Sequence, residues 1–156
     1  IVLPFTPVPI TGSTLGVLLV GSAYGTRLGG TTMLAYILVG IAGVPVFAGG
    51  KFGIAVLTGA TGGYIFGYVI AALIVGWLAE RRWDRSPWTT VIAMVVANVA
   101  IYTCGVVILA RVPSIGWSNV LALGVLPFLL GDAIKIAIAA AALPTAWRLK
   151  ERVTPR

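Results

Sequence analysis

Two charged side chains interrupt an apolar stretch near the C-terminal end of the chain. Asp132 and Lys135 lie in PFLLGDAIK, which runs from Pro127 to Lys135. A spacing of three residues places both side chains on one face of a helix. Charges within a membrane helix are costly, and they mark functional sites by default. The pair therefore predicts a polar ligand site, and the alternative is a mutually neutralising pair that only packs two helices.

A glycine-rich segment supplies the second group of candidates. FAGGKFGIAVLTGATGGY, from Phe47 to Tyr64, holds six glycines and a single cation, Lys51. Glycine permits irregular backbone, which at membrane depth is tolerated only against protein or a cavity. The segment suggests the roof of a pocket that faces the outside. A flexible loop with small-residue packing and an interfacial lysine is the alternative.

The rest of the polar inventory excludes several classes of chemistry. The chain has no histidine, one cysteine (Cys104) and four acidic residues. A zinc site and a disulfide framework cannot be built from this set. The phosphate-binding pattern G-x-x-x-x-G-K-[ST] is absent, so ATP hydrolysis by that route is excluded. We expect no catalytic residue, no metal and no cofactor, which makes a membrane enzyme a remote alternative.

The elements that must position these residues are membrane helices. Of 156 residues, 59% are hydrophobic and 10% are charged, whereas soluble domains carry about 25% charged residues. Apolar runs without period-2 alternation favour helices in a bilayer. We predict a single all-α membrane domain with spans at about residues 13–24, 31–46, 61–79, 89–110 and 127–147. A short lateral helix is expected in SIGWSNVLALGV, just before the last span.

The basic residues predict the orientation in the membrane. Eight of the eleven lie at Arg27, in ERRWDR and in the tail RLKERVTPR, whereas Lys51 and Arg111 lie in loops on the opposite side. The positive-inside rule makes the eight-charge side cytoplasmic. The net charge of +7 then reflects topology, not nucleic-acid binding. Because the chain begins with isoleucine, we expect a missing upstream span, and six spans would place both ends of the full chain in the cytoplasm.

Four motifs together resemble the BioY family of biotin-binding S components of energy-coupling factor (ECF) transporters. They are PVPIT, GVPVFAGG, TGGYIFGY and PFLLGDAIK, and the resemblance runs from Leu3 to about Leu149. It implies a six-helix S-component bundle with the first helix largely missing from this chain. It also implies high-affinity biotin capture at the outer face of a bacterial cell membrane. Uptake would involve a transmembrane T component and two ATPase subunits. An S component for another vitamin and a solitary carrier remain alternatives.

The resemblance also implies which residues bind the ligand. Asp132 and Lys135 match the family's G-D-x-x-K motif. The other positions matched by the family's glycine-rich motifs are Gly49, Lys51, Gly62, Gly63 and Tyr64.

Spacing alone suggests two further polar residues as candidates for the site. Asn98 and Tyr102 are four residues apart and share a helix face, as ligand contacts or as interhelical hydrogen-bonding groups. Tyr36 and Tyr68 are interpreted as aromatic residues of the membrane interface.

The chemistry of biotin suits these residue types. A carboxylate accepts hydrogen bonds from the ureido N–H groups, and a lysine can meet the ligand's acid. Side chains three residues apart on a helix are only about 5–6 Å apart, less than the length of extended biotin. Either the Lys135 side chain extends to the biotin carboxylate, or the tail of biotin folds back toward Lys135, or Lys51 meets the carboxylate instead.

Overall fold

The computed structural model describes residues 8–112 and 115–153, and within these residues it is helical without a β-sheet. This confirms the predicted all-α class. Long apolar runs form helices because each helix satisfies its own backbone hydrogen bonds. The elements are α1 (Ser13–Ile41), α2 (Ile54–Thr58), α3 (Gly62–Glu80), η1 (Trp83–Arg85), α4 (Pro87–Leu109), α5 (Gly116–Gly124) and α6 (Leu126–Val153).

Three helices in the described part of the chain are long and apolar enough to cross a membrane. They cover Gly62–Glu80, Pro87–Leu109 and Trp117–Lys150, of which the last takes in α5 and most of α6. These ranges overlap the expected spans at 61–79, 89–110 and 127–147. The short helix expected before residue 127 is α5.

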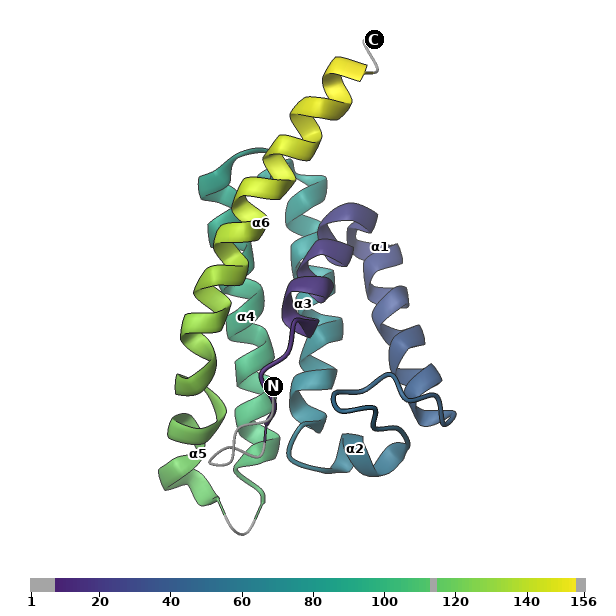
Figure 1. Ribbon diagram of the computed structural model, residues 1–156, viewed down its shortest axis with the longest axis vertical. Coiled ribbons are helices and arrows are strands. Elements are labelled where there is room, and N and C mark those ends of the chain that lie inside the picture. Colours follow the sequence, from purple (N-terminus) through teal and green to yellow (C-terminus); the bar gives the residue numbers. More distant parts are fainter. Residues whose placement is uncertain (1–7, 113–114, 154–156) are drawn as a thin grey trace.

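Helix α1 is a hairpin of two shorter helical segments that meet at Gly25. Gly25 has φ 74° and ψ −173°, a conformation that favours glycine. In Figure 1 the first segment runs up to this turn and the second runs back down beside it. The carboxylate of Glu80 accepts a hydrogen bond of 2.8 Å from the backbone N–H of Thr26, which caps the second segment. The two segments correspond to the expected spans 13–24 and 31–46, but the second starts directly after the turn and ends at Ile41.

Small residues bring the helices into close contact. A Cβ atom on Gly21 would lie 2.9 Å from the carbonyl oxygen of Ala72, and one on Gly67 would lie 2.8 Å from the Cα of Ile101. Glycine and alanine at such positions let helix backbones approach closely in a membrane. Helix α3 therefore forms the centre of the bundle, between α1 and α4.

The two ends of the bundle carry different elements. Figure 1 shows α2, α5 and the first described residues at one end, and the α3–α4 turn with the C-terminal part of α6 at the other. Helix α6 has 28 residues, so at 1.5 Å per residue it is about 42 Å long. It is therefore longer than the membrane's hydrocarbon core of about 30 Å.

Candidate functional site

A pocket opens at the end of the bundle that carries α2 and α5. Its empty space is about 730 Å³ with the open mouth included. The residues that line it come from the segment before α1, the 47–51 turn, the loop before α3 and the five helices α1, α2, α3, α4 and α6. They are Val8, Pro9, Thr11, Ser13, Thr14, Tyr36, Phe47, Ala48, Lys51, Val56, Thr61, Tyr64, Ile65, Tyr68, Ile101, Tyr102, Phe128, Asp132 and Lys135.

Asp132 is the centre of a polar network on one side of this pocket. The residue is only 5% exposed. Its Oδ1 accepts hydrogen bonds from the Lys135 ammonium at 2.9 Å and from the Thr14 hydroxyl at 3.4 Å. The Tyr102 hydroxyl donates to Oδ2. The network joins α1, α4 and α6, and the ion pair offsets the charge of a carboxylate that would be costly to bury alone.

Lys135 is bonded to Asp132 and lies on the same side of the pocket. Its ammonium also donates to the Thr14 hydroxyl at 2.9 Å, and its side chain is 14% exposed. The spacing of three residues thus yields a bonded ion pair. A ligand that contacts Asp132 meets an acceptor whose charge is already partly balanced.

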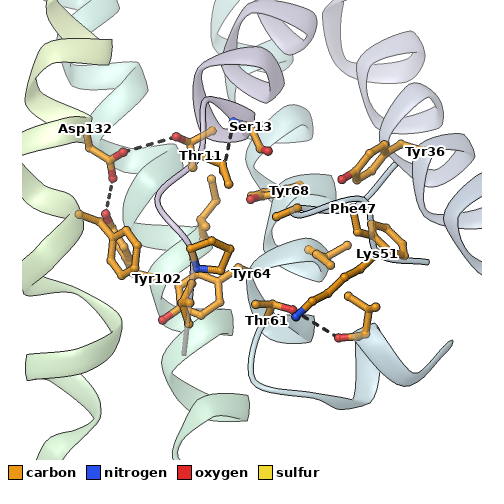
Figure 2. Close-up of a pocket in the computed structure, with 18 of the residues that line it drawn as sticks. Thr11, Ser13, Tyr36, Phe47, Lys51, Thr61, Tyr64, Tyr68, Tyr102 and Asp132 are labelled. Carbon is orange, nitrogen blue, oxygen red and sulfur yellow. Dashed lines mark hydrogen bonds between the residues drawn. The ribbon is translucent and has the colours of Figure 1, made fainter. Parts of the chain in front are cut away.

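Lys51 stands across the pocket from Asp132. Figure 2 shows its side chain extending toward Thr61, with the Asp132 network at the other side of the view. The lysine is exposed. It follows a tight turn in which Gly50 N–H donates to the Phe47 carbonyl at 3.0 Å. Gly49 has φ 74° and Gly50 has φ 71°, so these glycines position Lys51 at the mouth by shaping the turn.

Tyrosine rings line the pocket between these two sides. The rings of Tyr64 and Tyr102 are in edge contact, with centroids 6.5 Å apart. The Tyr64 hydroxyl donates to the Gly124 carbonyl at 2.8 Å and so fastens α5 to α3. Tyr36 and Tyr68, interpreted from the sequence as interfacial, both line the pocket. Four-residue spacing from Tyr64 is a signal that could have identified Tyr68.

Four of the expected site residues lie outside the pocket lining, namely Gly49, Gly62, Gly63 and Asn98. A Cβ atom on Gly62 would collide with the carbonyl of Leu57, and one on Gly63 with the carbonyl of Cys104. Both glycines therefore allow close backbone contacts. Asn98 lines a separate apolar groove between α4 and α6. It is 6% exposed, and its Oδ1 has no hydrogen-bond partner among the residues that the structure describes.

The helical bundle with this pocket has the fold of a transporter S component. A solved structure of the S-component for biotin from an ECF-type ABC transporter matches it with a TM-score of 0.83 and 22% sequence identity. The match covers 95% of this chain and 80% of the solved one.

Sequence comparisons then show the family. The BioY family model matches residues 1–152. The biotin transporter BioY of Rhizobium etli is 34% identical over 145 residues, covering 88% of this chain and 77% of that protein. The biotin transporter BioY of Thermotoga maritima is 37% identical over 140 residues, covering 88% and 80%. The chain belongs to the BioY family. This confirms the prediction of a membrane transport protein and not an enzyme.

Proposed function

We propose that this chain captures biotin in the pocket and acts as the biotin-specific component of an ECF-type transporter. Its relatives from Rhizobium etli and Thermotoga maritima are named biotin transporters. The observation that carries the proposal is the arrangement of the pocket, with a buried carboxylate on one side and a lysine on the other. Biotin has N–H donors at one end, an acid at the other and apolar atoms between.

The arrangement favours one orientation of the ligand. We infer that the ureido N–H groups donate to Asp132 and that Lys51 meets the carboxylate. Lys135 is bonded to Asp132 at 2.9 Å, so both ends of an extended ligand cannot reach this pair together. Each carboxylate oxygen has two lone pairs, so Oδ2 can accept from the ligand beside Tyr102.

The apolar part of the ligand would pack against side chains between the two polar sides. Ile65, Ile101 and Phe128 line the pocket. Ile101 is 1% exposed and Phe128 is 7% exposed. Burial of apolar surface contributes about 25 cal/mol per Å². These side chains would supply affinity, whereas the polar groups at the two ends would supply orientation.

The expected topology fits the position of the pocket. We infer that the end with Lys51 faces outward and that ERRWDRS and both ends of the full chain face the cytoplasm. Helix α2, which contributes Val56 to the pocket lining, and the α3–α4 turn lie at opposite ends of the bundle (Figure 1). This arrangement supports ligand capture from outside. The T component and two ATPase subunits are the partners that we propose for energised uptake.

Titration calorimetry of the purified chain tests the ligand. We expect binding of biotin without ATP, no binding of thiamine or riboflavin, and no ATPase activity. Preference for thiamine or riboflavin would make the chain an S component for a different vitamin. ATP-driven biotin uptake by this chain alone in liposomes would contradict the division of labour with separate ATPases.

A further inference from the structure

A cationic patch lies at the end of the bundle opposite the pocket, around the indole ring of Trp147. The guanidinium carbon of Arg85 lies 4.5 Å from the ring centroid, and the Lys150 ammonium lies 4.8 Å from it. Arg85 belongs to η1, whereas Trp147 and Lys150 belong to α6. One ring thus gathers two positive charges from separate elements.

A buried carboxylate fixes the position of this ring. The Trp147 indole N–H donates to Oδ2 of Asp84, which is only 4% exposed. Asp84 lies beneath the patch and offsets part of its positive charge. Lys150 is exposed and Arg85 is half-buried, so each cation has some surface that an anion can approach.

The surroundings of the patch place it at the membrane boundary. The short helix η1 and the start of α4 follow the membrane-length helix α3. The exposed rings of Trp77 and Trp88 lie near the end of α3 and at the start of α4. Exposed tryptophans of membrane proteins concentrate at the level of the lipid headgroups. Leu149, next to Lys150, is 55% exposed and adds apolar surface. A phosphate with an attached acyl chain fits this combination better than a free anion.

We propose that Arg85, Trp147 and Lys150 form a binding site for the phosphate of an anionic membrane lipid. A phosphate between Arg85 and Lys150 would tie α6 to the α3–α4 turn by charge-assisted hydrogen bonds. Helix α6 also carries Asp132 and Lys135. The lipid would therefore stabilise the helix that presents the polar side of the pocket.

The test compares phosphatidylglycerol with phosphatidylcholine of matched acyl chains, added to the purified chain in neutral detergent. We expect phosphatidylglycerol to raise the thermal unfolding temperature more and to be retained in native mass spectra. Arg85→Gln and Lys150→Gln should each weaken phosphatidylglycerol binding about fivefold, the effect of one basic side chain near an anionic membrane. Arg148→Gln and Arg111→Gln are the matched controls, and both should retain the preference.

Three results would overturn the proposal. One is equal binding of the two lipids by the unmodified chain. Another is equal weakening by Arg85→Gln, Lys150→Gln and the control Arg148→Gln, which would indicate diffuse attraction to the basic end and no defined site. The third is the same stabilisation by inorganic phosphate, which would show an anion site that does not require lipid. Thermal unfolding of each variant without lipid verifies folding and keeps the test independent of the ligand assignment.

Discussion

Replacing the two pocket lysines separately is expected to distinguish the ends of the bound ligand. Lys51→Met removes an exposed ammonium that lines the pocket. Among the described residues, this ammonium has no hydrogen-bond or ion-pair partner. The folded state should therefore lose little stability. If Lys51 meets the biotin carboxylate, the substitution removes one charge-assisted hydrogen bond.

The magnitude follows from the burial of each lysine. A hydrogen bond to a charged group contributes about 1.5–3 kcal/mol, which corresponds to roughly ten- to a hundredfold in affinity. Because Lys51 is exposed and screened by water, we expect a loss near tenfold for biotin. Biotin methyl ester has no negative carboxylate, so its affinity should hardly change.

Lys135→Met is expected to act through the fold. The Lys135 side chain is 14% exposed and that of Asp132 is 7% exposed. Removal of one partner of a buried ion pair destabilises a protein by about 3–5 kcal/mol, and the remaining exposure should put the loss toward the lower figure. The unfolding temperature should fall without ligand, and biotin and its ester should weaken alike. Asp132→Asn keeps the shape and one acceptor, and it too should weaken both ligands alike.

The assay is calorimetric titration of biotin and biotin methyl ester into each variant, with thermal unfolding of the ligand-free protein beside it. The reasoning would be refuted if Lys135→Met weakened biotin much more than the ester while Lys51→Met affected neither. Lys135 would then meet the carboxylate, and the ligand would have to fold back toward the Asp132 side.

Two further predictions concern topology and packing. A cysteine placed at Lys51, in a background without the native cysteine, should be labelled from outside intact cells, whereas one at Arg82 should not, and the reverse pattern would invert the orientation. In Gly124→Ala, the new Cβ would lie 2.5 Å from the Tyr64 hydroxyl, so overpacking should cost about 1–3 kcal/mol of stability. Gly16→Ala meets nothing within 4 Å and should be neutral or stabilising in the same unfolding assay.

The helical class was predictable from the sequence because it depends on composition and on the length of the apolar runs. The hairpin within α1 was only partly predictable. A connection was expected between residues 24 and 31, but helix resumes directly after Gly25. Its cap comes from Glu80, which is 54 residues further along the chain. Such a contact depends on the packed bundle and leaves no local pattern.

The candidate site likewise combines residues that were predictable from the sequence with contacts that depend on the packed bundle. Asp132 and Lys135 were predictable because charges are conspicuous within an apolar helix. Thr14 joins their network from α1, a partnership that spacing within α6 cannot indicate. Asn98 and Tyr102 were expected on one face, but four residues exceed one helical turn by about 40°. Tyr102 consequently lines both the pocket and the lateral groove, whereas Asn98 lines only the groove.

The ion pair between Asp132 and Lys135 also determines how the membrane voltage acts on the site. The pair is neutral overall, so the described lining residues of the empty pocket carry a net charge of +1, that of Lys51. If Lys51 meets the ligand's carboxylate, the loaded pocket has no net charge. A voltage of 100 mV acts on each elementary charge that crosses the membrane with about 2.3 kcal/mol. The voltage would then bias movements of the empty site, while the vitamin-loaded site would move without electrical work.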